Sequence, residues 1–221
     1  MEALVLLSGG QDSATCLAWA KTEFDEVHTV SFNYGQRHRI ELQSSANLSV
    51  LAGAKSHLVI PILSIQSLGN SALVCSGDIG ANHDIDSTLP ASFVPGRNYI
   101  FLGLAAARAY QLNVSNLVTG VCQTDYSGYP DCRDLSIKAI EVALFLCLQK
   151  EFTIHTPLMW KTKAETVLMM KEFGKLDWYA DTHTCYEGQR PPCGKCPACQ
   201  LRQKGFREAG IVDPLMERRG W

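Results

Sequence analysis

The stretch Ala3-Leu4-Val5-Leu6-Leu7-Ser8-Gly9-Gly10-Gln11-Asp12-Ser13 joins an apolar run to a polar loop with two adjacent glycines. The five apolar residues do not alternate with polar ones, which is typical of a strand covered on both faces. From Ser13 to Thr22 apolar side chains recur at helical spacing, so the loop connects a strand to a helix. Glycines let backbone N–H groups turn toward a ligand, and a helix N-terminus favours an anion. The stretch therefore predicts a phosphate-binding loop for a nucleotide.

The rest of the chain alternates apolar strand-like runs with helical patterns. This order predicts an α/β fold, a doubly wound parallel sheet with helices on both faces. Polar motifs follow several of the strands, so we expect them to share the carboxyl edge of the sheet, where ligands bind in such folds. We expect strands at 3–7, 27–32, 57–60, 117–121 and 152–155, and helices at 13–22, 38–52, 98–111, 133–149 and 162–173.

Composition changes along the chain and suggests two units. We expect residues 1–180 to form a nucleotide-binding and catalytic domain, and residues 181–221 to form a small cysteine-rich tail. Residues 62–92 are polar and poorly periodic, and we interpret them as an insertion or a lid near the site.

Four cysteines in the tail, Cys185, Cys193, Cys196 and Cys199, have the spacing of metal ligands. Thiolates bind zinc tetrahedrally, and a short segment with little apolar mass is what a structural metal stabilises. The pattern therefore predicts a structural zinc site. The residues leave other possibilities open: an iron–sulfur cluster, His183 in place of Cys185, disulfides, or free thiols.

Charge and hydropathy exclude several classes of protein. The net charge is −2, and nucleic-acid binders usually have a basic balance, so we expect no nucleic-acid partner. The longest apolar run, 142–148, is far shorter than the ~20 residues of a membrane span. The amino terminus lacks a basic, cleavable leader pattern. Scattered cysteines such as Cys16 and Cys147 are interpreted as small buried side chains, so we expect a reduced, cytoplasmic protein without a membrane partner.

Several polar residues near expected strand ends are candidates for chemistry. Asp12 lies at the mouth of the loop, where a carboxylate can hold Mg²⁺ bridging phosphate oxygens or can satisfy the helix N-terminus. Arginines in turns can form paired hydrogen bonds to a carboxylate or phosphate. Asp125 and Asp131 are plausible acceptors for the N–H groups of a guanine-like ring, although Asp is also a common turn residue.

The pattern Ser8-Gly9-Gly10-Gln11-Asp12-Ser13 resembles the signature of the PP-loop ATP pyrophosphatases, and the P-loop lysine is absent. Longer motifs narrow the resemblance to the 7-cyano-7-deazaguanine synthase family, over about residues 3–205. These motifs are 33–38 (NYGQRH), 93–98 (FVPGRN), 120–122 with 125–133 (DYSGYPDCR), 156–159 (TPLM) and the four cysteines. The resemblance implies a Rossmann-like PP-loop fold, also described as adenine nucleotide alpha hydrolase-like.

This resemblance implies an activity as well. The chain would be an ATP-dependent carbon–nitrogen ligase that uses ATP with Mg²⁺, ammonia and 7-carboxy-7-deazaguanine to make 7-cyano-7-deazaguanine for queuosine. It also implies a homodimer with one zinc ion per chain on the four cysteines. Because the chain leaves no room for a glutaminase domain, we expect free ammonia or a separate protein to supply the nitrogen.

We assign roles to individual residues on this basis. Catalysis is expected of Asp12, Arg97 and Lys163. Substrate binding is expected of Tyr34, Arg37, Arg97, Asp125, Asp131 and Arg133. ATP binding is expected of Leu7, Ser8, Gly9, Gly10, Gln11, Asp12, Ser13, Ala14, Thr15, Cys16 and Leu17.

Two alternatives belong to other classes of protein. A PP-loop sulfur transferase that modifies tRNA would need a basic face and a catalytic cysteine pair, for which only Cys122 and Cys132 are candidates. A zinc module that binds nucleic acid through its tail would use basic residues such as Arg190 and Arg202, but it would leave the α/β unit unexplained.

Overall fold

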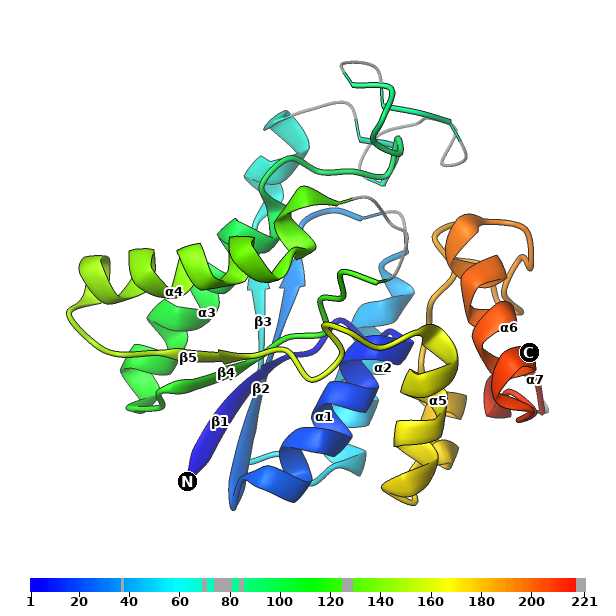
Figure 1. Ribbon diagram of the computed structural model, residues 1–221, viewed down its shortest axis with the longest axis horizontal. Helices are drawn as coiled ribbons and strands as arrows, with labels where there is room; N and C mark the ends of the chain where they lie inside the picture. Colours follow the sequence, from blue (N-terminus) through cyan, green and yellow to red (C-terminus); the bar gives the residue numbers. More distant parts are fainter. Residues whose placement is uncertain (37, 69–70, 74–80, 84–85, 125–128, 218–221) are drawn as a thin grey trace.

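Five parallel strands form one sheet in the order β3-β2-β1-β4-β5 (Figure 1). They are β1 (Glu2–Leu6), β2 (Glu26–Asn33), β3 (Ser56–Pro61), β4 (Asn116–Val118) and β5 (Thr153–His155). The computed structural model describes residues 1–36, 38–68, 71–73, 81–83, 86–124 and 129–217. Each predicted strand is present within a few residues of its expected bounds.

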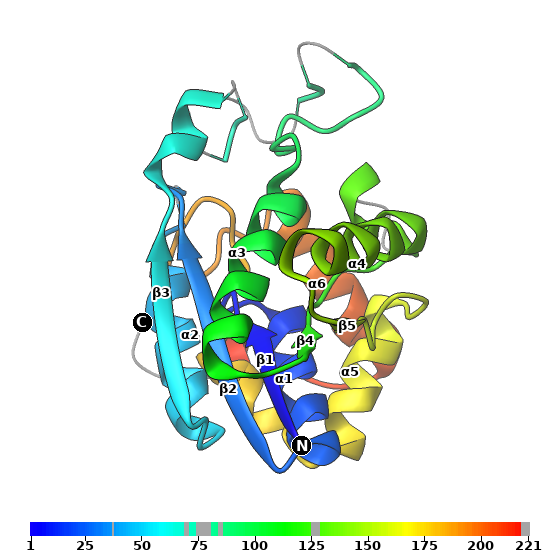
Figure 2. The ribbon, with the colours of Figure 1, turned by 90° about the vertical axis from the view of Figure 1, so that its left-hand side faces the viewer.

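Helices cover both faces of the sheet, so the predicted doubly wound α/β fold is confirmed. Figure 2 shows α3 and α4 on one face, with α1 and α2 on the other. The helices are α1 (Gln11–Glu23), α2 (Ile40–Leu51), α3 (Arg97–Leu112), α4 (Asp134–Leu148), α5 (Lys163–Glu172), α6 (Pro197–Ala209) and α7 (Pro214–Glu217), with short 3₁₀ turns at Leu63–Leu68, Pro130–Cys132 and Leu176–Asp181.

The central strand β1 explains why the apolar run lacks alternation. Successive side chains of a strand point to opposite faces. Ala3 and Val5 therefore join the apolar layer under α1 and α5, whereas Leu4 joins the layer under α3 and α4. All three are at most 1% exposed, so both faces of this strand are buried.

Strand β1 also marks the point where the winding of the sheet reverses. It pairs with β2 on one side and with β4 on the other. In such folds the loops that leave the two central strands separate and open a crevice at their carboxyl ends. The loop after β1 is the predicted phosphate loop, and the segment that follows β4 faces it.

The C-terminal segment packs on the α/β unit. Phe206 of α6 belongs to the same apolar layer as Val167 and Met170 of α5. Tyr179 joins this layer, and its hydroxyl lies 2.6 Å from Oγ1 of Thr15 in α1. The expected boundary between residues 180 and 181 stays a prediction, although the apolar layer continues across it.

Two further expectations can be compared with the structure. The described parts of 62–92 lie beyond the carboxyl ends of the strands (Figure 1), and their role as a lid stays a prediction. Cys16 is buried as expected, but the expectation for Cys147 was wrong, because this cysteine is exposed near the end of α4. None of the helices in the described ranges has both the length and the apolar character needed to cross a membrane.

Candidate active site

A cavity of about 290 Å³ opens at the carboxyl edge of the sheet, where the two central strands diverge. Its walls come from the loop after β1, the end of β2, the segment after β4, and the first turns of α3 and α5. The segment 183–186 and helix α6 close another side. The cavity thus brings together parts of the chain from the first strand to the tail.

The loop after β1 has the backbone geometry expected of a phosphate-binding loop. Gly9 has a φ of +92°, and a Cβ atom at this position would lie 2.2 Å from the carbonyl oxygen of Glu41. Only glycine fits there. No described side chain caps α1 at Gly10, so its first N–H groups face the cavity without a capping oxygen. The hydroxyls of Ser8 and Ser13 lie 3.0 Å apart beside them.

Lys163 and Asp12 form an ion pair above this loop. The Nζ atom of Lys163 lies 2.6 Å from Oδ2 of Asp12, and both residues line the cavity. Lys163 is the first residue of α5, fixed there by a capping box between Thr162 and Glu165. The other carboxylate oxygen of Asp12, Oδ1, is buried and has no hydrogen-bond partner in the part of the chain that the structure describes.

On the opposite wall, the guanidinium of Arg97 lies among aromatic side chains. Its carbon is 5.9 Å from the ring centres of both Tyr34 and Tyr129. An Arg97 nitrogen donates to the hydroxyl of Tyr34 at 3.4 Å. Burial raises the pKa of Tyr34 to about 12, so this phenol is neutral at physiological pH. Among the described residues no carboxylate lies within ion-pair distance of Arg97, although Asp131 acts on its charge from farther away, and the guanidinium faces the cavity.

A second part of this wall suits a flat ring. The rings of Phe32 and Phe101 are stacked, with centres 4.3 Å apart and an interplanar angle of 13°. Tyr34 contacts Phe101, and all three side chains line the cavity. Tyr186 faces the same space, and burial raises the pKa of its hydroxyl. Aromatic walls next to a cation are typical of a site for a planar, negatively charged molecule.

The predicted ATP-binding residues divide into two groups. Leu7, Ser8, Gly10, Gln11, Asp12 and Ser13 line the cavity, and Gly9 lies beneath them in the loop. The side chains of Ala14, Thr15, Cys16 and Leu17 instead lie in the interior, since all four residues are 0% exposed.

The predicted substrate residues also divide. Tyr34 and Arg97 line the cavity, whereas Asp131 and Arg133 are not among its lining residues. An oxygen of Asp131 accepts a hydrogen bond of 3.0 Å from the backbone N–H of Asn98, which caps α3. Arg133 is exposed at the start of α4. Arg37 and Asp125 lie outside the described residues.

Sequence reasoning missed several lining residues, among them Glu41. Glu41 forms a buried pair with His38, whose Nε2 lies 3.2 Å from a carboxylate oxygen. Tyr129 and Tyr186 were not singled out, although each lies within or beside a quoted motif. Arg202 was taken for a basic surface residue, but it is 4% exposed and its guanidinium binds Asp213 through two nitrogens. Ala198 and Phe206, four positions before and after Arg202, were the available signal for burial, because residues at this spacing share one face of a helix.

The cysteine pair of the sulfur-transferase alternative also lines the cavity. Burial raises the pKa of Cys132 to about 12, and its sulfur accepts a hydrogen bond from the side chain of Asn98 at 3.2 Å. A thiol with such a pKa is scarcely ionised at neutral pH, and the thiolate is the nucleophilic form. Cys132 is therefore a poor nucleophile.

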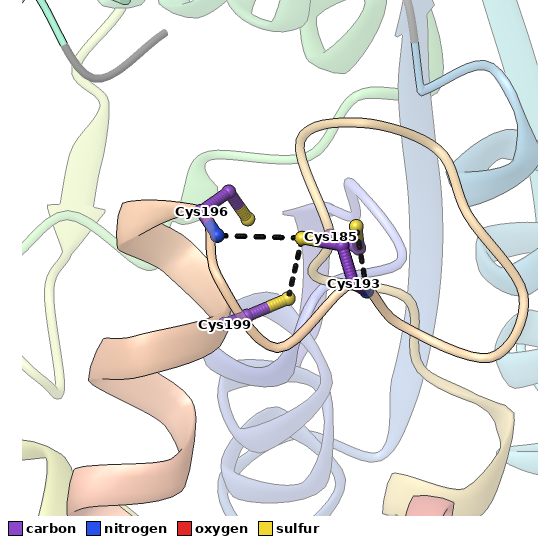
Figure 3. Close-up of side chains that lie close together, drawn as sticks. All are labelled: Cys185, Cys193, Cys196 and Cys199. Atoms are coloured by element: carbon purple, nitrogen blue, oxygen red, sulfur yellow. Dashed lines mark hydrogen bonds between the residues drawn. The ribbon is translucent and has the colours of Figure 1, made fainter.

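The four tail cysteines converge on one point (Figure 3). Cys185, Cys193, Cys196 and Cys199 have sulfur atoms that all lie within 4.8 Å of one another. No disulfide links any two of these four cysteines. Backbone N–H groups of Lys195 and Cys196 point to the sulfur of Cys193 at 3.4 and 3.3 Å, an arrangement that stabilises thiolates. The cluster can hold a metal ion through four sulfurs.

His183, the alternative ligand, lies outside this cluster. Its Nε2 lies 3.2 Å from the backbone oxygen of Cys185, and the residue lines the cavity. The backbone N–H of His183 donates to the carbonyl oxygen of Gly9 at 2.8 Å. The first residues of the tail are thus hydrogen-bonded to the phosphate loop.

Comparison with known proteins identifies the family of this chain. The family model described as "Queuosine biosynthesis protein QueC" matches residues 2–210. The chain belongs to the QueC family. The family expected from the motifs is confirmed, because 7-cyano-7-deazaguanine synthases of Chromobacterium violaceum and Laribacter hongkongensis are 51% and 50% identical to it. Each alignment covers 98% of this chain and 94% of the relative.

Similarity to solved structures is more distant. The NH3-dependent NAD synthetase from Campylobacter jejuni, solved in complex with the nitrate ion, is 16% identical, with a TM-score of 0.46. The similarity covers 78% of this chain and 63% of that chain. Within the QueC match of this chain lie the phosphate loop, the Lys163–Asp12 pair, the aromatic wall and the four cysteines.

Proposed function

We propose that this QueC-family chain is an ATP-dependent ligase that converts 7-carboxy-7-deazaguanine and ammonia into 7-cyano-7-deazaguanine. One observation carries the proposal beyond the family: the phosphate loop and the guanidinium of Arg97 line the same cavity. ATP phosphates on the loop and a carboxylate on the arginine would then share one enclosed space. Aromatic walls beside Arg97 would hold the flat deazaguanine ring.

The first chemical cycle in this proposal activates the carboxylate. A carboxylate does not react with ammonia, because its leaving group would be oxide. Its oxygen attacks the α-phosphorus of ATP, the bond to the β-phosphate oxygen breaks, and pyrophosphate leaves. The N–H groups at the start of α1, the hydroxyls of Ser8 and Ser13, and the ammonium of Lys163 would stabilise the charge on the departing pyrophosphate. Ammonia then attacks the acyl carbon, loses one proton and expels AMP, which leaves the amide.

The second cycle removes the amide oxygen. That oxygen attacks a second ATP at the α-phosphorus, and pyrophosphate leaves again. The amide nitrogen gives up its two remaining protons as AMP departs with the oxygen, and the carbon–nitrogen triple bond forms. The balance is two ATP consumed and two AMP and two pyrophosphate released for each nitrile.

One heterocycle has to stay bound through both cycles, and positioning of this kind contributes much of the rate. Tyr34 and Arg97 are the proposed contacts. Asp131 would act through the cap that it provides to α3, from which Arg97 extends. Arg133 would need to turn toward the cavity to contact the substrate. Arg37 and Asp125, outside the described residues, stay candidates for the ring.

The proposal includes one structural zinc ion per chain on the four cysteines. Four sulfurs at these separations suit a closed tetrahedral site, with no position open to substrate. Mg²⁺ would accompany ATP and offset phosphate charge, and Oδ1 of Asp12 is the oxygen that could reach it. A homodimer and a cytoplasmic location, both expected from the sequence, also belong to the proposal.

The test uses purified protein with ATP, Mg²⁺, the carboxy-deazaguanine and either ¹⁵N-ammonium or amide-labelled glutamine. We expect ¹⁵N from ammonium in the nitrile by mass spectrometry, and two AMP with two pyrophosphate per nitrile by phosphorus NMR. At fixed total ammonium the rate should rise with pH, because neutral ammonia is the nucleophile. ADP and phosphate as products would overturn the adenylate mechanism, and efficient transfer from glutamine would overturn the assignment of ammonia.

A further inference from the structure

Helix α6 connects the four-cysteine cluster to the wall of the cavity. Cys196 is its N-cap residue, and Cys199 lies in its first turn. Gly205 lies in its third turn, about 9 Å further along a helix that rises 1.5 Å per residue. Figure 1 shows α6 beside α5, the helix that begins with Lys163. One rigid element therefore touches both the candidate metal site and the residue that pairs with Asp12.

The contact between Gly205 and Lys163 leaves no room for a side chain. A Cβ atom on Gly205 would lie 2.6 Å from Cβ of Lys163 and 3.1 Å from its carbonyl carbon. Rotating the lysine side chain cannot relieve contacts to Cβ and to the backbone. Glycine lowers the stability of a helix interior, so its place in the middle of α6 is explained by this close approach.

Lys163 has little freedom to move away from α6. The capping box of Thr162 and Glu165 fixes the backbone on either side of it. Its ammonium reaches Oδ2 of Asp12 at 2.6 Å, and its side chain is only 11% exposed. A shift of the start of α5 would therefore lengthen this ion pair and alter the charge that faces the phosphate loop.

We infer that Gly205 is a positioning residue, and that α6 uses it to hold the Lys163–Asp12 ion pair over the phosphate loop. The inference rests on the proposed function only in taking ATP phosphates as the ligand of that loop. A second contact also connects the tail to the phosphate loop. The backbone N–H of His183, two residues before Cys185, donates a hydrogen bond to the carbonyl oxygen of Gly9. The metal-binding tail thereby sets the geometry of the nucleotide site.

The first experiment measures MgATP affinity by calorimetry in the absence of the carboxylate substrate. Gly205→Ala should bind MgATP about tenfold more weakly than the parent chain, a size usual for coupled neighbours. Gly103→Ala is the matched control, because it adds the same methyl inside α3 where a Cβ meets nothing within 4 Å. Unchanged affinity in Gly205→Ala would overturn the inference.

A double-mutant cycle separates positioning from general damage to the fold. Lys163→Met keeps the length of the side chain and removes its charge. If Gly205 acts through the ammonium, adding Gly205→Ala to Lys163→Met should not weaken ATP binding further. An equal loss of affinity in both backgrounds would show a merely structural role and would overturn the inference.

Removal of the metal is the third measurement, and it keeps the inference testable even if Gly205→Ala does not fold. Chelation under reducing conditions should weaken MgATP binding in the parent chain and change it much less in Lys163→Met. Equal weakening in both would overturn the link through Lys163. If the parent chain with its metal bound no ATP, the proposed function would fail instead, so the two failures are distinguishable.

Discussion

The ammonium of Lys163 lies 2.6 Å from a carboxylate oxygen of Asp12, although the two residues are 151 positions apart in the chain. If this cation stabilises the departing pyrophosphate, Lys163→Met should lower kcat roughly 100-fold, the usual cost of one such donor. AMP release at saturating ATP is the measurement. Lys138→Met is the control, since Lys138 also pairs with an aspartate, Asp134, but on the surface of α4. A loss no greater than that of the control would contradict the role.

From the four-cysteine cluster we predict that the chain binds one zinc ion. Elemental analysis of anaerobically purified protein should find one zinc per chain and negligible iron. Cys196→Ser should lose the metal and much of its folding stability, because metal binding and folding are coupled at such sites. Cys147→Ser, an exposed cysteine outside the cluster, should keep both. A brown protein with visible absorption would contradict zinc.

If Arg97 binds the carboxylate of the substrate, its replacement should weaken the binding of that substrate and leave the binding of MgATP nearly unchanged. A hydrogen-bonded charge contributes about 1.5–3 kcal/mol, so Arg97→Gln should raise KM for the carboxy-deazaguanine roughly tenfold to a hundredfold. Its affinity for MgATP should change little. Steady-state kinetics measures the first and calorimetry the second. Arg108→Gln, further along α3, is the matched control. Equal losses for both substrates would mean that Arg97 supports the fold instead of the carboxylate.

Replacing Arg202 should lower the stability of the folded chain strongly. Its guanidinium binds both carboxylate oxygens of Asp213, at 2.6 and 2.8 Å, and both side chains are at most 10% exposed. Removing one partner of a buried ion pair leaves an unpaired charge, so Arg202→Leu should lower the free energy of unfolding by about 3–5 kcal/mol. Urea denaturation measures it. Adding Asp213→Asn should restore part of the loss, and a double variant as unstable as the single one would contradict this account.

The stabilising contribution of His155 should decrease as pH falls. Half-burial beside Trp19 and Phe24 lowers its pKa in the folded state. The unfolded chain therefore binds a proton more readily, and stability falls as pH drops below the ordinary histidine value of about 6.5. The stability difference between the parent chain and His155→Asn should shrink from pH 7.5 to 5.5 in urea titrations. A constant or growing difference would contradict the assignment.

The sheet and its first five helices were predictable because their signal is local. The run at β1, the glycines that follow it and the helical periodicities each lie within about a dozen residues. Helix α6 was not predicted, since its first residues were interpreted only as metal ligands. Its role also depends on contacts between distant segments, such as Gly205 against Lys163.

Individual side chains were harder to predict for the same reason. Asp131 lies within an unusual motif, and no sequence pattern distinguishes a residue that binds a ring from one that caps a neighbouring helix. Arg202 was taken for surface charge because its partner, Asp213, is eleven positions away in a segment without a motif. Arg97 was predicted as a site residue because it follows a turn with Pro95 and Gly96, and it lines the cavity, while its role stays a prediction.

The hydrogen bond from His183 to Gly9 also orders events during synthesis. Gly9 leaves the ribosome early, whereas its partner is added on the order of ten seconds or more later at roughly 5–20 residues per second. Until then the loop lacks its hydrogen bond from His183, and the cavity lacks the wall that residues 183–186 and α6 form. The cavity is therefore complete only after the tail has been synthesised, however early the central strands are made.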